Sequence, residues 1–422
     1  MKPLANPKGL VPQLSDSTFN DSNRPIRICQ IPDGTGFYPP LGADTSSWET
    51  HRLSIALSAL GYPVQVYSAG KRLGDYPYAI KRVYSPAIGN REVSKLLFGV
   101  RLAKLFPRIV RSFEVIHYHA PVPAAFTLAL KIERPATVIT WGDPFLGGNV
   151  GPKRIWNTMA SRSGSLLSRW ASIELQIHVL KRVDRIIAVS SFLRERLHTT
   201  FGIASEKIDV VHPGVDTEKF SPSLDPLPLR IKLRLTGSRR VIVCPARVTP
   251  LKSQIDLIRA LPKLVSKHNV CVLFVGEITD PLYHNLLLHE AAKLGVTNSI
   301  YFTGTVSGND FPLYYRLADV VVLPSEAEGL PSSLLEAMSC GCAIVASDIP
   351  ACREVAVTGR EIKFFELHQT DRLADEVSFI LASPLVQEGM GLYSRSTALE
   401  HYSWTKVSKD TLKCYQRAIM SK

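Results

Sequence analysis

Two glutamates eight residues apart mark the segment with the clearest capacity for chemistry. Glu328 lies at a predicted loop-to-helix junction, and Glu336 lies within the helix that follows. Ionised carboxylates accept hydrogen bonds from hydroxyl groups and repel phosphates. The turn-forming residues that lead from Glu328 into the helix are Gly329, Leu330 and Pro331.

The same junction predicts a group of free backbone amides. A helix that begins after a Gly–Pro loop presents N–H groups at the positive end of its dipole, where phosphates bind. Ser332 or Ser333 is expected to cap this helix. A ligand that carries both phosphates and sugar hydroxyls would satisfy the amides and the carboxylates together.

Two cations form a second part of the same predicted site. Arg247 follows a predicted strand, and Lys252 opens the next helix after a loop that contains Pro250. Both side chains are expected at the carboxyl end of a parallel strand, where open α/β sheets bind their ligands. Arg supplies a planar fork and Lys a point charge, which suits them to neutralise a diphosphate.

The elements that must position these residues alternate between short β-rich runs and helical patterns, which is typical of βαβ units with parallel sheets. The runs are apolar throughout, as in strands that helices cover on both faces. Eleven strands are expected, at 26–31, 64–69, 115–119, 137–141, 185–190, 209–213, 240–246, 269–277, 299–304, 319–325 and 343–348.

A proline-rich segment divides the 422 residues into halves. Residues 221–230 contain three prolines without periodicity, which disfavours helix and strand and indicates a linker. We therefore expect a disordered tail at 1–25, two doubly wound Rossmann-like domains that face a central cleft, and C-terminal helices that pack back across both domains. The first domain spans 26–220, the second 231–384, and the C-terminal helices 385–422.

The net charge of +13 is concentrated in the first half. Residues 1–220 hold 28 of the 50 Lys and Arg but only 17 of the 37 Asp and Glu, so their balance is +11. This excess predicts an anionic partner for the first domain. Nucleic acid is disfavoured, because no recognised binding motif or interleaved aromatic pattern accompanies the charge.

Composition excludes several other classes. No apolar run is long enough for a transmembrane helix, and the first 25 residues lack the apolar core of a signal peptide. The seven cysteines show no disulfide framework, so a reduced, cytoplasmic compartment is expected. Cys340, Cys342 and Cys352 are interpreted as small buried residues around a tight helix-to-strand turn, in preference to a metal site.

A basic segment at 90–112 is a candidate membrane-binding helix. Its predicted apolar stripe, Phe98, Leu102, Leu105 and Ile109, lies beside a basic face formed by Arg101, Lys104, Arg108 and Arg111. This pattern suits the surface of an anionic bilayer, with Pro107 as a kink. The alternative is an ordinary helix that buries the stripe in the core and leaves the basic face in water.

The order of these segments resembles a retaining glycosyltransferase of the GT-B fold, in glycosyltransferase family 4 (glycosyl transferases group 1). The most specific block is EGLPSSLLEAMSCGCAIVAS at 328–347, which contains the family's Glu-x7-Glu motif. The supporting blocks are FYPPLGAD at 37–44, DRIIAVSSFLRERL at 184–197, VVHPGVDTEKFSP at 210–222 and PARVTPLKS at 245–253.

The resemblance implies a nucleotide-sugar donor and a saccharide or lipid-linked saccharide acceptor. Arg247 and Lys252 match the pair that grips the donor diphosphate, Glu328 the residue that faces the transferred sugar, and Glu336 the ribose-binding residue. Backbone amides near Gly329, Leu330 and Pro331 would border the donor, although Pro331 itself has no N–H. Gly42 matches the glycine-rich first loop. No metal cofactor is expected, because the chain has no Asp-x-Asp pair.

The first domain departs from the family at the end of segment 137–141. Many relatives carry a histidine there, close to the reacting sugar, and this chain carries Trp141. His119 or Asp143 would compensate, or Trp141 would stack on a sugar or serve packing alone. In the second domain Ser253 replaces the usual glycine after Lys252.

These features predict a retaining hexosyltransferase in the cytoplasm, with peripheral attachment to the inner face of the cytoplasmic membrane as a further hypothesis. The departures leave one alternative open, a non-catalytic nucleotide-sugar-binding subunit that would bind donor without transfer. An epimerase of the same fold is disfavoured by the intact Glu-x7-Glu block.

Overall fold

The computed structural model describes residues 24–33, 45–70, 74–84, 91–142, 166–235, 237 and 239–422. Most of the expected N-terminal tail, and the candidate residues Gly42 and Asp143, lie outside these ranges. Within them, no helix has both the length and the apolarity that crossing a membrane requires.

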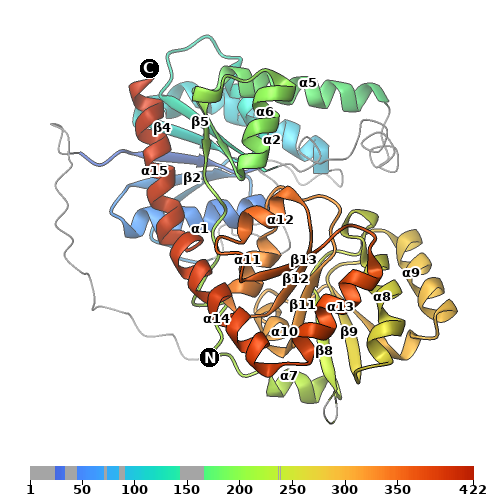
Figure 1. The fold of residues 1–422 in the computed structure, drawn as a ribbon. Helices are drawn as coiled ribbons and strands as arrows, with labels where there is room; N and C mark the ends of the chain where they lie inside the picture. The colour runs from blue at the N-terminus through green and yellow to red at the C-terminus, as the bar shows by residue number, and fades with distance from the viewer. Residues whose placement is uncertain are drawn as a thin grey trace.

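The first domain is a parallel sheet of seven strands in the order β3-β2-β1-β4-β5-β6-β7 (Figure 1). Its strands are β1 (Ile28–Ile31), β2 (Val64–Ser68), β3 (Ala79–Arg82), β4 (Val115–Tyr118), β5 (Ala136–Trp141), β6 (Arg185–Ala188) and β7 (Ile208–Val210). Its helices are α1 (Thr45–Ala59), α2 (Arg91–Ile109), η1 (Val110–Ser112), α3 (Pro121–Leu128), α5 (Leu166–Arg182), α6 (Ser191–Phe201) and η3 (Ser205–Lys207).

The second domain is a parallel sheet of six strands in the order β10-β9-β8-β11-β12-β13. Its strands are β8 (Arg240–Cys244), β9 (Val270–Val275), β10 (Ile300–Gly304), β11 (Val320–Leu323), β12 (Ile344–Ser347) and β13 (Ile362–Phe365). Its helices are α7 (Leu227–Lys232), η4 (Pro250–Lys252), α8 (Gln254–Val265), α9 (Pro281–Lys293), η5 (Thr297–Ser299), α10 (Phe311–Leu317), α11 (Ser332–Ser339), α12 (Pro350–Val355) and α13 (Thr370–Leu381).

These two parallel sheets confirm the expected α/β architecture. All eleven expected strands are present, and the structure adds β3 and β13 at sheet edges. In each sheet the order reverses beside one central strand, between β1 and β4 and between β8 and β11. Open α/β sheets bind ligands at the carboxyl end of such a switch point.

The expectation that residues 221–230 resist helix formation is wrong for their second part. Helix α7 begins at Leu227, with Pro228 in its first turn. A proline is tolerated there because its missing N–H has no helical partner in any case. Leu229 is buried in the core of the second domain, so α7 packs as part of that domain.

The C-terminal helices are α14 (Pro384–His401) and α15 (Trp404–Met420). Helix α14 packs on α11 and α13 of the second domain, whereas α15 packs on α1 and on strands β4, β5 and β6 of the first (Figure 1). Leu412, Tyr415 and Ala418 are buried in the same core cluster as Val66 and Val115. One face of the first sheet is therefore covered by the end of the chain.

Two glycines in α14 give opposite predictions. In Gly391→Ala the new Cβ would collide with the backbone carbonyl of Gly341, whereas in Gly389→Ala it would meet no atom within 4 Å. We expect Gly391→Ala to lower the free energy of unfolding by about 1–3 kcal/mol. Gly389→Ala should raise it by about 0.5–1 kcal/mol, because alanine loses less backbone entropy in a helix. Urea unfolding of both variants measures these changes in the free energy of unfolding. Equal effects of the two substitutions would contradict the prediction.

Candidate active site

Lys252 and Glu328 meet at the carboxyl edge of the second sheet. Lys252 ends η4 after strand β8, and Glu328 lies in the loop after β11, the neighbouring strand. Their Nζ and Oε1 atoms form an ion pair, and both side chains are largely buried. A backbone hydrogen bond from Glu326 N to Leu251 O (2.9 Å) joins the two loops. The pair therefore occupies the topological switch point.

Arg247 lies on the same edge but stays in solvent. Its side chain is exposed, and among the described residues it has no ion-pair partner. Its backbone carbonyl accepts a hydrogen bond from Gln254 Nε2 (2.8 Å), which fixes the loop that carries it. The loop is thus fixed near the switch point, and the exposed guanidinium of Arg247 is available to a ligand.

Ser253 has a backbone conformation that favours glycine. Its φ angle is 43°, in the left-handed region that favours glycine. The side chain is buried, and its Oγ donates a hydrogen bond to Asp256 Oδ2 (3.1 Å) at the start of α8. Ser253 therefore makes the left-handed turn that directly follows Lys252.

Helix α11 begins directly after the loop of Glu328. The residue before its first turn is Pro331, and no side chain caps the helix. The expectation that Ser332 or Ser333 caps it is wrong, because both serines lie inside the first turn. The first amides of α11 are consequently open to an acceptor from a ligand. Leu330 is buried in the core and anchors the loop.

Glu336 lies in α11 and is partly buried. Its Oε2 accepts a hydrogen bond from the Tyr315 hydroxyl (2.8 Å), which comes from α10. Burial raises the pKa of Glu336 to about 7, although the hydrogen bond from Tyr315 and the charge of Lys219 oppose this rise. The motifs in the sequence did not identify Tyr315 or Lys219 as site residues. Lys219 lies within the family-like segment 210–222, whereas nothing in the sequence marked Tyr315.

The raised pKa of Glu336 predicts that the ligand-free protein loses stability as the pH rises. Its folded-state pKa is about 7 and its ordinary value is 4.5, so between these pH values the folded protein keeps a proton that the unfolded chain has released. The stabilisation is complete below about pH 4.5 and is lost as the pH rises through about 7. The full shift corresponds to about 3 kcal/mol.

Glu336→Gln removes this titration. Urea unfolding between pH 5 and pH 8 should show that the difference in stability between the variant and the wild type changes steadily in favour of the variant. A difference that stays constant across this range would contradict the assignment.

The first domain places its candidates around strands β4 and β5. His119 is partly buried directly after β4, and its Nε2 lies 2.5 Å from Gln30 Oε1. Trp141 ends β5 with only 4% of its surface exposed, inside the apolar core. Of the two roles left open for Trp141, the structure therefore favours packing over stacking on an exposed sugar.

The two domains touch at the candidate site. A Cβ on Gly329 would lie 2.5 Å from the carbonyl oxygen of Gly142, the residue after β5. Nearby, Glu354 of α12 accepts hydrogen bonds from the backbone N–H of Ser191 (2.6 Å) at the start of α6 and from His212 Nε2 (2.8 Å). The carboxyl edges of the two sheets therefore face each other across this contact.

The basic helix α2 buries part of its predicted stripe. Phe98, Leu102 and Ile109 lie in the core, as the alternative interpretation expected, whereas Leu105 remains 38% exposed. The solvent-exposed face of α2 instead carries other apolar residues in the first half of the helix and cations in the second half. Its exposed members include Val93, Leu96, Val100, Lys104 and Arg108, and Arg111 is exposed in η1 directly after the helix.

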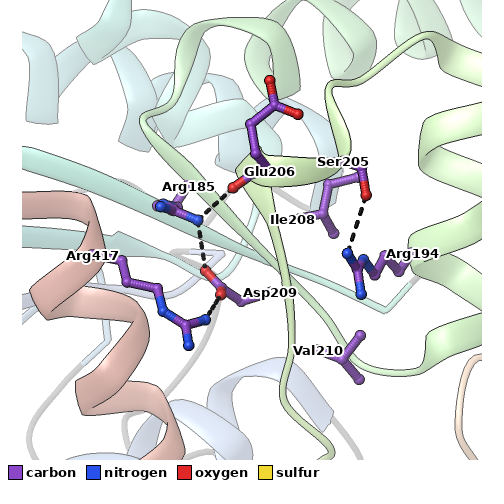
Figure 2. A pocket seen from close by; sticks show the side chains of 8 residues that line it. All are labelled: Arg185, Arg194, Ser205, Glu206, Ile208, Asp209, Val210 and Arg417. Atoms are coloured by element: carbon purple, nitrogen blue, oxygen red, sulfur yellow. Dashed lines mark hydrogen bonds and ion pairs between the residues drawn. The ribbon is translucent and has the colours of Figure 1, made fainter. Parts of the chain in front are cut away.

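A separate cavity of about 340 Å³ lies at the outer edge of the first sheet (Figure 2). Its cations are already paired within the protein. Asp209 lies 3.5 Å from Arg185 and forms an ion pair with Arg417 of α15, and Arg194 donates to Ser205 Oγ (3.1 Å). Arg185 begins β6, so this cavity is near the amino ends of the strands, whereas the candidate site is at their carboxyl ends. The ion pairs of the cavity anchor α15.

Cys340 and Cys342 after α11, and Cys352 within α12, are all buried, which confirms their expected packing role. Cys340 directly follows α11, and β12 begins four residues later.

Comparisons with known proteins agree with this geometry. Residues 228–397 match the family "Glycosyl transferases group 1", and residues 49–219 match "Glycosyltransferase Family 4". A GDP-mannose-dependent alpha-(1-6)-phosphatidylinositol monomannoside mannosyltransferase of Mycolicibacterium smegmatis is 30% identical over 61% of this chain and 69% of its own length. A D-inositol 3-phosphate glycosyltransferase of Mycobacteroides abscessus is 29% identical over 57% of this chain and 53% of its own length.

The fold has a close match among solved structures. Sucrose-phosphate synthase from Thermosynechococcus elongatus superposes with a TM-score of 0.73 at 16% identity, over 94% of this chain and all of that one. Together, the two family matches cover most of both domains. The chain belongs to the glycosyl transferases group 1, family 4, and is a nucleotide-sugar-dependent glycosyltransferase of the GT-B fold.

Proposed function

We propose that the enzyme binds the diphosphate of its donor between Arg247, Lys252 and the first amides of α11. The observation that carries this proposal is the Lys252–Glu328 pair at the switch point, beside a helix without a side-chain cap. Glu328 would accept hydrogen bonds from hydroxyls of the transferred hexose, and Glu336 from the ribose.

The Lys252–Glu328 pair also suggests how the site is prepared for the donor. Each side chain neutralises the other in a largely buried position. A diphosphate competes for the ammonium group of Lys252, which frees carboxylate oxygens of Glu328 for sugar hydroxyls. Binding of the phosphates and binding of the sugar are then coupled through one ion pair.

The reaction proceeds through electrostatic stabilisation of the leaving group. As the bond between the hexose and the phosphate breaks, negative charge develops on the nucleoside diphosphate, and Arg247 and Lys252 stabilise it. The acceptor hydroxyl attacks the same face of the sugar, and the departing phosphate takes its proton, so configuration is retained. In this scheme protein cations, not a metal, neutralise the diphosphate, and no protein nucleophile is required.

The donor and the acceptor are proposed from the relatives together with the charge of this chain. The M. smegmatis relative is named for GDP-mannose and for a phosphatidylinositol mannoside, and the M. abscessus relative for an inositol phosphate. The first half of this chain carries +11 of the net charge of +13. We therefore propose GDP-mannose as the first donor to test and an acceptor that bears an anionic, lipid-linked headgroup.

A panel of UDP-, GDP- and ADP-sugars, with mass-spectrometric detection of products, tests this function. We expect one donor to be bound, slowly hydrolysed, and transferred when an acceptor is present. Binding without hydrolysis or transfer would indicate the non-catalytic subunit. Neither binding nor turnover across the panel would overturn the proposed function.

Helix α2 is proposed as a peripheral membrane contact at the inner face of the cytoplasmic membrane. Its solvent face combines exposed Val93, Leu96 and Val100 with Lys104 and Arg108 further along the helix. Apolar side chains that enter the headgroup region beside cations that meet anionic lipids are typical of interfacial helices. This contact would bring a lipid-linked acceptor to the first domain.

Neutralising the basic face should weaken binding to anionic vesicles. The variant combines Arg101→Gln, Lys104→Gln, Arg108→Gln and Arg111→Gln. At about 1 kcal/mol per exposed cation, we expect a loss in affinity of about 100-fold or more for phosphatidylglycerol vesicles at low salt, measured by sedimentation. The matched control, Arg259→Gln with Lys267→Gln and Lys293→Gln on the second domain, should change little. Absence of binding by the wild type would contradict the membrane proposal.

A further inference from the structure

A chain of polar side chains runs beneath the acceptor side of the first domain. Gln30 Nε2 donates to the Tyr415 hydroxyl (3.0 Å), which lies 2.7 Å from His117 Nδ1. His117 Nε2 lies 2.7 Å from Thr140 Oγ1, and His119 Nε2 lies 2.5 Å from Gln30 Oε1. Gln30, His117 and Tyr415 are completely buried. The chain thus connects α15, at the C-terminus, to the end of β4.

The donors and acceptors in this chain follow one direction. Gln30 uses its amide oxygen toward His119, and that oxygen can only accept, so His119 Nε2 carries the proton. The Gln30 amide nitrogen donates to Tyr415, whose own hydroxyl proton is then directed to His117 Nδ1. His117 therefore donates from Nε2 to Thr140. His119 Nδ1 is left as an unprotonated acceptor.

Burial holds both histidines in the neutral form. Burial lowers the pKa of His119 to about 3 and the pKa of His117 well below its usual value. Their imidazole rings lie 4.1 Å apart between centroids, so a charge on one would also disfavour a charge on the other. At neutral pH, His119 is an uncharged ring with a lone pair on Nδ1.

The position of His119 suggests a role for this lone pair in the reaction. Its backbone N–H donates to Ile31 O (2.9 Å), so it lies at the β1–β4 switch point of the first sheet. Strand β5 lies beside β4, and the residue after β5, Gly142, contacts Gly329 of the donor loop. His119 is therefore on the edge of the first sheet that faces the donor site.

We propose that His119 Nδ1 accepts a hydrogen bond from an acceptor hydroxyl beside the attacking one, whose own proton goes to the departing phosphate, and that Gln30 and Tyr415 are positioning residues that fix this tautomer of His119. The proposal rests on the proposed function, since it assigns a partner to the acceptor in that reaction. It gives the C-terminal helix a role in catalysis through Tyr415, which is 385 residues from Gln30 along the chain.

The first test reads the tautomer directly and needs no substrate. In 15N-histidine spectra of the full-length protein at pH 7, with the His119→Asn variant used for assignment, His119 should show a protonated Nε2 and an unprotonated Nδ1. Tyr415→Phe should give a mixture of tautomers, and Gln30→Glu should give an imidazolium. A wild-type His119 that is charged or protonated on Nδ1 would overturn the proposal.

The second test separates positioning from folding. Tyr118→Phe is the matched control, because its buried hydroxyl bonds Thr127 Oγ1 (2.8 Å) outside the chain of side chains. With GDP-mannose and an alkyl mannoside as probes, or the donor that the panel selects, Tyr415→Phe and Gln30→Glu should each lower kcat for transfer by about tenfold or more. The KM for the donor and the rate of donor hydrolysis should stay within twofold.

The outcomes distinguish this inference from the proposed function. Unchanged transfer by both variants, in an enzyme whose wild type transfers sugar, overturns the role of His119 alone. If Tyr415→Phe fails to fold, the kcat of Gln30→Glu for transfer tests the role of His119. A wild type that neither binds nor turns over any donor overturns the proposed function, whereas the spectra still report the tautomer.

Discussion

Replacing Lys252 with methionine should lower kcat for sugar transfer by about 100- to 1,000-fold. Methionine keeps much of the length of the side chain but removes the charge that stabilises the departing diphosphate. A loss of this size in kcat is usual when one preorganised electrostatic group is removed. It also leaves the largely buried Glu328 without its partner. Steady-state transfer with the donor selected by the panel measures this effect.

The control for this prediction is Lys263→Met. Lys263 lies in α8 and pairs with Asp375 (2.8 Å) on the surface of the second domain. Exposed pairs of this kind contribute little to stability, and this one has no part in the proposed site. Its variant should transfer sugar at the wild-type rate. A Lys252→Met enzyme that stays within twofold of wild type would contradict the assignment of Lys252 to the leaving group.

Gly329→Ala is expected to reduce transfer by about 100-fold while each domain remains folded. The added Cβ would lie 2.5 Å from the Gly142 carbonyl oxygen, which no real Cβ contact allows. Because this oxygen belongs to the other domain, the collision is relieved by moving the domains apart. A displacement of about 1 Å between reacting groups is enough to produce a loss of this size.

Two measurements on Gly329→Ala separate this explanation from unfolding. Small-angle scattering should show a larger radius of gyration than in the wild type, while the circular dichroism spectrum stays unchanged. Gly389→Ala, which adds the same methyl group in open space, should have wild-type activity. Full activity in Gly329→Ala would show that transfer does not need the approach of Gly329 to Gly142.

Much of the architecture could be predicted because buried parallel strands leave continuous apolar runs in the sequence. The two strands that sequence reasoning missed are short edge strands. The exposed residues of β3 include Lys81 and Arg82, and β13 has only four residues. Because β3 is mostly exposed, its composition resembles that of a loop, whereas in β13 Lys363 interrupts a short apolar run. Helix α7 was missed for another reason, because its prolines fall where a first turn tolerates them.

The candidate site could be predicted where its residues lie close together in the sequence. Arg247, Lys252, Glu328 and Glu336 lie in two compact segments whose spacing and flanking turns are visible in the sequence. Pairings between distant segments were not visible. The contact of Tyr315 with Glu336 and the chain from Tyr415 to His119 depend on how helices and strands far apart in the sequence pack together.

The basic helix shows the limit of periodicity as evidence. A stripe at helical spacing marks a face but does not say whether that face meets the core or a membrane. In α2 the marked stripe is mostly buried, and the exposed apolar residues belong to a second, shorter set. Only the packing of α2 on α3 decides between these two faces.

The most direct test of the central claim is a crystal structure of the enzyme with its nucleoside diphosphate. We predict that the diphosphate contacts Arg247, Lys252 and the first amides of α11, with the ribose hydroxyls on Glu336. A diphosphate bound elsewhere, for example among Arg185, Arg194 and Arg417 in the cavity at the far edge of the first sheet, would contradict the account of how this enzyme holds its donor.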